Sequence, residues 1–452
     1  MADLNEIFHA YDVRGIYPDQ IDAEAAGQIG AAFAHYVAEV DPGTRRVLVA
    51  RDMRESGVEL SSAFARGVQR QGLDVIDLGL ASTDLLYFAA GYLDSPGAMF
   101  TASHNPAAYN GIKFCRSGAR PVGEETGLDR IRHDAARELP PAPSEPGSIS
   151  ARDLLGDFAD HVRSFLSDPG AVKPLKIVAD TANGMGGLIV PAVFDPLPVS
   201  VEILYEELDG TFPNHPADPI QTENLADLRA RVVETGADLG LAFDGDADRV
   251  FVVDEKGEPM SGSTTTALVA SMMLEREPGA TILYNLICSR AVPELITEGG
   301  GTPVRTRVGH SFVKAVMADT GAIFGGEHSA HYYFRDNYRA DSGIIAAMHV
   351  LEYVSAHDEP LSELRKRFKR YAASGEINTT VDDTAAVIDE VARRYADRPQ
   401  DRLDGLTVDC GDWWFNLRPS NTEPLLRLNL EAPTDDEVAR HVDEVRAAMI
   451  GA

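Results

Sequence analysis

The pattern of apolar residues predicts a chain of alternating strands and helices. Short apolar runs that end in a polar residue occur at Arg46–Asp52, Lys176–Asp180 and Thr281–Asn285. Each run is followed by a segment of small or helix-compatible residues. Because a strand buried on both faces reads as an uninterrupted apolar run, this rhythm predicts three α/β units with largely buried sheets.

Changes in local composition predict three boundaries between four domains. Residues 139–147 form a proline-rich connector, and residues 254–259 form a turn-rich break. A third break is expected at residues 372–375, after a basic helix over residues 362–371. A last helix is expected to begin at Thr434, where Thr-Asp-Asp-Glu forms a capping box. The predicted domains are residues 1–147, 148–254, 255–371 and 372–452.

Composition narrows the function classes. The 452 residues exceed what one hydrophobic core organises, and the formal net charge of −30 argues against a nucleic-acid surface and against anionic membranes. No long uncharged apolar run is present, and the N-terminal residues lack the pattern of a signal peptide. The widely spaced Cys115, Cys288 and Cys410 predict neither disulfides nor a zinc site. We therefore expect a cytoplasmic protein with no nucleic-acid or membrane partner.

Residues 99–106 place a hydroxyl nucleophile on a loop. Met99 and Phe100 end an apolar strand, and Asn105-Pro106 stops regular structure at once. Ser103 therefore lies on a tight loop with His104 beside it. Because the same residue types are common in ordinary polar turns, this segment alone leaves both interpretations open.

An apolar strand over residues 239–243 leads directly into Asp244, Asp246 and Asp248, which are separated only by Gly and Ala. Carboxylates are the hard oxygen ligands that Mg²⁺ prefers. Three of them on one turn repel each other without a cation, which favours a metal site over an acidic turn. An EF-hand is excluded because Arg249 occupies the sixth position, where that loop needs Gly.

Two further loops carry donors and acceptors suited to a phosphorylated sugar. Residues 324–331 combine glycines with Glu327, Ser329 and His331, which suits sugar hydroxyls. Residues 418–424 combine a guanidinium, hydroxyls and an amide, which are the components of a phosphate cradle. Taken alone, the first also fits a polar loop and the second a type I turn.

These four segments, in this order, resemble those of the α-D-phosphohexomutases, and most closely the bacterial phosphomannomutase/phosphoglucomutase branch. The resemblance spans nearly the whole chain, from Tyr11-Asp12-Val13-Arg14-Gly15 to the loop at Arg418. It implies an α/β protein of four domains around a central cleft. Three similar α/β/α sandwiches with mixed sheets would precede a C-terminal α+β domain resembling TATA-binding protein.

The resemblance also implies a function. The chain would be an isomerase that interconverts hexose 1-phosphate and hexose 6-phosphate, of mannose and of glucose, through a phosphoserine and a hexose 1,6-bisphosphate. Mg²⁺ would be the cofactor and the bisphosphate would be both activator and intermediate. The partners would be small hexose phosphates, and the oligomeric state is left open.

The resemblance assigns roles residue by residue. The implied metal ligands are the phosphorylated Ser103, Asp244, Asp246 and Asp248. The implied catalytic residues are Ser103, His104, Lys113, Arg14 and His310. The implied substrate-binding residues are Arg249, Glu327, Ser329, His331, Arg418, Ser420, Asn421 and Thr422.

The general base is left open among Lys113, His310 and Arg14. Lys113 would need a depressed pKa for this role, and His104 is favoured as a group that orients the serine loop. The chain departs from the family at one point. Relatives often carry a cleft lysine just after the domain-three strand, where residues 285–290 contain none, and Arg290 is a candidate substitute.

The preferred sugar stays open. Phosphoglucosamine mutases commonly carry Gly at the position of Asn421 and Asp at that of Tyr109, so these residues favour mannose and glucose over glucosamine. Mannose and glucose differ only at the 2-hydroxyl, and a site that grips the phosphate and the 3- and 4-hydroxyls would discriminate poorly between them. Two functions of a different class also stay open: a non-catalytic hexose-phosphate-binding regulator and a phosphatase that uses the same metal site.

Overall fold

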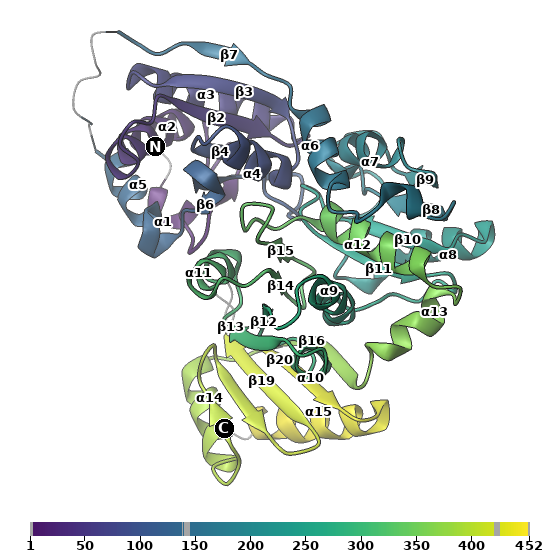
Figure 1. Cartoon of the computed structure of the whole chain (residues 1–452). Coiled ribbons are helices and arrows are strands. Elements are labelled where there is room, and N and C mark those ends of the chain that lie inside the picture. The colour runs from purple at the N-terminus through teal and green to yellow at the C-terminus, as the bar shows by residue number, and fades with distance from the viewer. Residues whose placement is uncertain (1–2, 138, 140–144, 420–424, 451–452) are drawn as a thin grey trace.

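A computed structural model of the chain describes residues 3–137, 139, 145–419 and 425–450. Four units follow one another along the chain, each built on its own sheet, from the purple N-terminal unit to the yellow C-terminal one (Figure 1). The predicted strands are confirmed as β2 (Arg46–Arg51), β8 (Lys176–Asp180) and β12 (Thr281–Asn285). The helices expected after them are also confirmed, as α3 (Ser56–Arg70), α7 (Gly186–Phe194) and α10 (Ala291–Glu298).

The first unit carries a seven-stranded mixed sheet of order β1-β5-β4-β2-β3-β7, with β6 (Arg120–Pro121) paired to β5. Its other strands are β1 (Val13–Ile16), β3 (Asp74–Leu80), β4 (Gly97–Phe100), β5 (Tyr109–Arg116) and β7 (Ile149–Ala151). Its other helices are α1 (Leu4–Ile7), α2 (Ala23–Val40), α4 (Thr83–Tyr92) and α5 (Leu128–Ala135). The sheet extends past residue 147, because β7 pairs in parallel with β3.

The second unit has a sheet of order β11-β10-β8-β9, and the third has β13-β12-β14-β15. The strands not yet bounded are β9 (Ser200–Leu204), β10 (Leu239–Phe243), β11 (Val250–Asp254), β13 (Thr302–Thr306), β14 (Phe324–Gly326) and β15 (Tyr332–Phe334). The remaining helices are α6 (Leu155–Arg163), α8 (Ala226–Thr235), α9 (Gly262–Arg276), α11 (His310–Thr320), α12 (Gly343–Ala356) and α13 (Leu361–Leu364).

One pairing scheme recurs in all three units. In each unit a first strand (β2, β8 or β12) pairs in parallel with a second (β3, β9 or β13) and with a third (β4, β10 or β14). A fourth strand (β5, β11 or β15) pairs antiparallel with the third. The predicted repeat of α/β units is therefore confirmed. The loop between third and fourth strands occupies the equivalent place in each unit, and these are the loops that hold Ser103, the aspartates of residues 244–248, and Glu327.

The fourth unit is α+β, as predicted. Its antiparallel sheet has the order β16-β20-β19-β18-β17. Its elements are β16 (Ala372–Thr380), α14 (Thr384–Arg394), β17 (Gln400–Asp401), β18 (Leu406–Asp409), β19 (Trp414–Pro419), β20 (Leu425–Ala432) and α15 (Asp435–Ile450). The helix predicted to begin at Thr434 is confirmed, since the Glu437 amide donates to the Thr434 hydroxyl at 3.3 Å.

The structure corrects the third boundary segment. In place of one helix over residues 362–371, the chain forms the short α13 and a 3₁₀ turn at Arg365–Arg367. Phe368, which follows this turn, is buried in the core. Residues 372–375, expected to be a break, form the start of β16, with an irregularity in register before Glu376.

The first three units share one continuous hydrophobic core. It runs from Leu86 on α4 through Phe158 on α6 and Val250 on β11 to Ile344 on α12. The fourth unit has a separate core around Phe415. Within the part of the chain that the structure describes, no helix is both long and apolar enough to cross a bilayer.

A buried carboxyl joins the first unit to the third. Asp84, at the start of α4, accepts hydrogen bonds from the hydroxyls of Ser82 and Ser342, the latter at 2.6 Å. Burial raises the pKa of Asp84 to about 7, against the opposing effect of the two hydroxyls. The folded chain therefore holds this proton at a pH where the unfolded chain has lost it.

We expect the thermal stability of Asp84→Asn relative to the wild type to rise between pH 5 and pH 8. The unfolded carboxyl ionises near pH 4 and the folded one only near pH 7, so the wild type alone loses stability as pH rises, by roughly 2 kcal/mol over this range. Differential scanning calorimetry at several pH values measures the difference. The control Asp19→Asn changes an exposed carboxylate, and its stability difference from the wild type should not vary with pH. A difference for Asp84→Asn that does not vary with pH would contradict the prediction.

Candidate functional site

Loops from the first two units meet at Ser103. Its hydroxyl donates to Asp244 Oδ2 at 3.0 Å, although 141 residues separate the two in sequence. A second contact between the same units joins the Thr83 hydroxyl to Asp246 Oδ2 at 2.6 Å. The chain thus brings its candidate nucleophile onto its carboxylate cluster.

Ser103 is held in an unusual backbone conformation. Its φ of 51° lies in the left-handed region, which non-glycine residues rarely adopt. The Ser103 amide donates to the Thr101 hydroxyl at 2.9 Å, and Arg249 Nη2 lies 3.3 Å from Ser103 Oγ. Strain of this kind persists only where the surroundings fix it, and it is typical of functional loops.

His104 lies beside the nucleophile as a neutral imidazole. Its Nδ1 is 3.2 Å from Ser103 Oγ and accepts a hydrogen bond from Arg249. Burial and, after it, the positive charges of Arg249 and Arg14 hold the pKa of His104 well below its usual range. This arrangement supports the interpretation of His104 as a group that orients the serine loop.

Asp244, Asp246 and Asp248 form a buried cluster in which one carboxylate oxygen from each residue lies within 4.8 Å of the other two. One oxygen of Asp246 and one of Asp248 are buried without a hydrogen-bond partner among the described residues. Burial, opposed by Arg249, raises the pKa of Asp244, and the neighbouring carboxylates raise it further. Hard, partly unpartnered oxygen donors that repel one another are a donor set suited to Mg²⁺.

Lys113, on β5, neutralises part of this charge. Its ammonium lies 2.7 Å from Asp246 Oδ2 and 2.7 Å from Asp248 Oδ2. Burial alone would depress the pKa of Lys113, but the two carboxylates reverse the effect and raise it well above its usual value. Beside these two carboxylates Lys113 is held as a cation, and the choice of general base stays a prediction.

The third unit contributes a polar cluster after β14. Glu327 accepts hydrogen bonds from the Asn285 side chain, from the Gly309 amide and, at 2.8 Å, from the Tyr333 hydroxyl. His331 Nδ1 lies 3.2 Å from Ser329 Oγ. The three residues predicted to read sugar hydroxyls therefore lie together on one loop.

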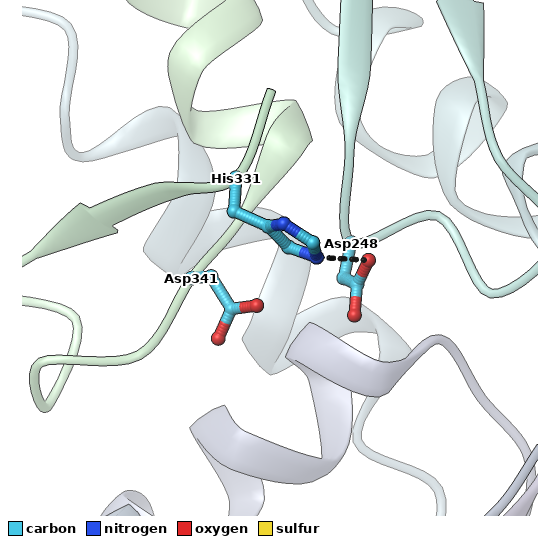
Figure 2. A group of neighbouring side chains, drawn as sticks. All are labelled: Asp248, His331 and Asp341. Carbon is cyan, nitrogen blue, oxygen red and sulfur yellow. Dashed lines mark ion pairs between the residues drawn. The ribbon is translucent and has the colours of Figure 1, made fainter. Parts of the chain in front are cut away.

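His331 also connects this loop to the aspartate cluster. Its Nε2 lies 3.6 Å from Asp248 Oδ1, an ion-pair distance that joins the second and third units. Figure 2 shows His331, Asp248 and Asp341 turned toward one another. Asp341 in turn pairs with the buried Lys314 at 2.7 Å.

His310 begins α11 as a half-buried residue. Burial and, second, the charge of Lys314 on the same helix lower the pKa of His310 to about 3, so it is neutral at physiological pH. Arg290 does not take the place of the missing cleft lysine. Its guanidinium pairs with Asp409 and donates to the Gly411 carbonyl, which lie in the fourth unit, and this prediction is corrected.

The remaining predicted residues lie on β1 and β19. Arg14 donates to Asn105 Oδ1 at 2.7 Å and pairs with Asp12, and a guanidinium does not deprotonate in proteins, which removes Arg14 as a base. Arg418 is buried near Glu376, with 3.7 Å between Nη2 and Oε2. The predicted substrate-binding residues Ser420, Asn421 and Thr422 lie outside the described residues.

Sequence reasoning missed three residues that hold the site together: Arg54 contacts the Ser103 loop, Thr83 contacts Asp246, and Asn285 contacts Glu327. Arg54 and Asn285 stand at or just after the polar end of a predicted strand. That position was the available signal, since the carboxyl ends of parallel strands gather at one edge of a sheet.

Comparisons with known proteins match the whole architecture. The family models of phosphoglucomutase/phosphomannomutase match as α/β/α domain I at residues 5–140, domain II at 156–257, domain III at 261–371 and the C-terminal domain at 376–448. A phosphomannomutase of Salmonella montevideo is 40% identical over 439 residues, covering 95% of each chain. A phosphomannomutase of Escherichia coli K12 is 38% identical over 439 residues, with the same coverage.

Solved structures give the same result. A phosphoglucomutase/phosphomannomutase family protein from Burkholderia thailandensis superposes with a TM-score of 0.89 at 34% identity, covering 99% of this chain and 98% of that one. An Aspergillus fumigatus N-acetylphosphoglucosamine mutase, solved with GlcNAc-6P and magnesium, has a TM-score of 0.59 at 14% identity, over 81% and 92% of the chains. The second likeness shows a shared fold only.

Mg²⁺ is expected to raise the thermal unfolding midpoint of the wild type, and Asp246→Asn is expected to remove that rise. A cation that binds only the folded chain stabilises it by about 2.7 kcal/mol at a hundredfold excess over its dissociation constant. Scanning fluorimetry across a Mg²⁺ titration measures the shift. Asp134→Asn, at a buried carboxylate that pairs with His35, is the control that should keep it. An equal rise in Asp246→Asn would count against the site.

Proposed function

The chain belongs to the phosphoglucomutase/phosphomannomutase family and is a hexose-phosphate mutase, and we propose that it works through phosphorylated Ser103. The observation that carries this proposal is the contact of Ser103 Oγ with Asp244, at 3.0 Å, beside Arg249. A hydroxyl nucleophile held on a carboxylate cluster fits phosphoryl transfer, in which catalysis consists largely of positioning and charge neutralisation.

In the proposed reaction, phosphorylated Ser103 gives its phosphoryl group to the 6-hydroxyl of a hexose 1-phosphate. The resulting 1,6-bisphosphate turns over in the site and returns its 1-phosphoryl group to Ser103, which releases hexose 6-phosphate. The bisphosphate is thus both the intermediate and the activator. In this way one serine serves both directions of an isomerisation.

We propose Mg²⁺ as the cofactor, with Asp244, Asp246, Asp248 and phosphorylated Ser103 as its ligands. When bound, it would neutralise the charge of the transferring phosphoryl group. Arg249 lies 3.3 Å from Ser103 Oγ and would bind the same phosphoryl oxygens. Lys113 contributes as a fixed cation in this scheme, because its ammonium is retained.

We propose His310 as the group that accepts the hydroxyl proton. Of the three candidate bases, Arg14 cannot give up a proton and Lys113 holds its proton tightly, whereas His310 is neutral. The Nδ1 atom of His310 is buried and has no hydrogen-bond partner among the described residues, so this nitrogen is available to a proton. The charge of a bound phosphate would raise the basicity of this imidazole.

Binding of the sugar is assigned to the third and fourth domains. Glu327, Ser329 and His331 would read sugar hydroxyls, and Arg418 with Ser420, Asn421 and Thr422 would hold the phosphate that does not react. Because none of these groups singles out the 2-hydroxyl, we propose activity on both mannose and glucose phosphates.

We also propose that the chain divides into its four domains at residues 147, 254 and 371. The strand β7 follows the first of these boundaries and still pairs with the sheet of the first domain.

Ser103→Ala is expected to lower mutase turnover by at least about 10³-fold, because the group that carries the phosphoryl is gone. Purified enzyme is incubated with mannose 1-phosphate, Mg²⁺ and a trace of glucose 1,6-bisphosphate, and mannose 6-phosphate is quantified, with glucose and glucosamine 1-phosphates in parallel. Ser150→Ala, on exposed β7, should match the wild type. If the wild type is folded and phosphorylated yet converts none of these sugars, the proposal fails. Release of inorganic phosphate would indicate a phosphatase instead.

His310→Asn is expected to lower kcat by about 10²- to 10⁴-fold with little change in KM, since loss of a proton acceptor affects the chemical step and not the grip on the sugar phosphate. Steady-state kinetics on mannose 1-phosphate separate the two parameters. His133→Asn on α5 changes an exposed histidine and should leave both unchanged. An unchanged kcat in His310→Asn would assign the proton to another acceptor.

A further inference from the structure

Arg54 is a buried guanidinium directed at the loop that carries Ser103. It lies between β2 and α3 and is 1% exposed. Its Nη2 donates to the carbonyl oxygens of Ser103 at 3.0 Å and of Asn105 at 2.6 Å. Its Nη1 donates to the carbonyl oxygens of Pro106 at 2.9 Å and of Tyr109 at 3.0 Å. One side chain thus satisfies four backbone acceptors between Ser103 and Tyr109, the first residue of β5.

The remaining faces of this guanidinium are also occupied. Arg54 Nε lies 3.2 Å from Asp52 Oδ2, and the Arg54 amide donates to Asp52 Oδ1 at 2.9 Å. The ring of Phe212, from the second unit, lies over the guanidinium with 5.1 Å between Cζ and the ring centroid. Gly210 lies against the Arg54 backbone, where a Cβ would come within 2.7 Å of Cα. Because the Arg54 guanidinium is removed from water and its donors are all used, its position in the structure is fixed.

The loop itself needs such support. Between the end of β4 at Phe100 and the start of β5 at Tyr109, the chain forms turns in place of a regular ladder, and Ser103 has a positive φ. With the carbonyl of Ser103 bound to Arg54, its hydroxyl is directed at Asp244. One contact at the Ser103 carbonyl and another at its hydroxyl together fix the position of this residue.

We propose that Arg54 is a positioning residue for phosphoryl transfer, which sets the Ser103 hydroxyl against the aspartates by fixing the carbonyls of its loop. This inference rests on the proposed role of Ser103. A lysine could not replace Arg54, because its donors radiate from one atom, whereas four carbonyls and Asp52 require the planar five-donor fork. Arg54 touches neither the substrate nor the transferring group in this scheme, so its effect passes through the loop.

Arg54→Lys tests the proposal, with Arg46→Lys as the matched control. Arg46 lies at the other end of β2 and donates to Ser95 Oγ and to the Leu93 carbonyl, away from the site. In Arg54→Lys we expect kcat to fall by about 10²-fold or more, since small displacements of a reacting group cost about that much, while KM for mannose 1-phosphate stays within about twofold. Amide hydrogen exchange over residues 101–109 should accelerate in Arg54→Lys and not in Arg46→Lys.

The exchange measurement keeps this inference separate from the proposed function. A wild type without mutase activity overturns the phosphoserine mechanism, whereas unchanged exchange over residues 101–109 in Arg54→Lys overturns the positioning role by itself. A loss of kcat that only parallels a lower folded fraction, with exchange faster throughout the chain, also overturns it. If Arg54→Lys does not fold, Phe212→Leu is the milder variant. In Phe212→Leu we expect faster exchange over residues 101–109 and a severalfold lower kcat.

Discussion

The buried negative charge of the three aspartates is the constraint on which the rest of the site depends. Three carboxylates on one turn, removed from water, are stable only with positive charge beside them. Lys113 comes from the first domain and Arg249 from the same loop, and both lie in direct contact with the cluster. Docking of the first domain on the second therefore offsets part of this charge through Lys113, and the same contact brings Ser103 to the cluster.

The repeated fold explains how one chain supplies several parts of a single site. Each of the first three domains pairs its strands in the same order, so the loop between the third and fourth strands emerges at an equivalent edge. One such loop carries Ser103, the next carries the three aspartates, and the last carries the polar cluster around Glu327. The shared hydrophobic core that joins these domains fixes the loops relative to one another.

Much of the site could be predicted because its chemistry is local in sequence. Ser103 with His104, and Asp244 with Asp246 and Asp248, each lie within a few residues, and residue type with spacing already indicates what such groups do. The rest depends on contacts that local spacing does not display. The Lys113 ammonium pairs with carboxylates more than a hundred residues away. Arg290 was a candidate substitute for the missing cleft lysine, but its guanidinium pairs with Asp409 in the fourth unit.

The sequence by itself determined the alternation of strands and helices, the four-domain order and the loops that carry chemical groups. These follow from periodicity and local spacing, which a linear chain displays directly. Only the tertiary structure decided which groups meet: Ser103 with Asp244, Arg54 with the serine loop, and His331 with Asp248. It also decided which groups hold protons, because burial and neighbouring charge arise from contacts between segments that are far apart along the chain.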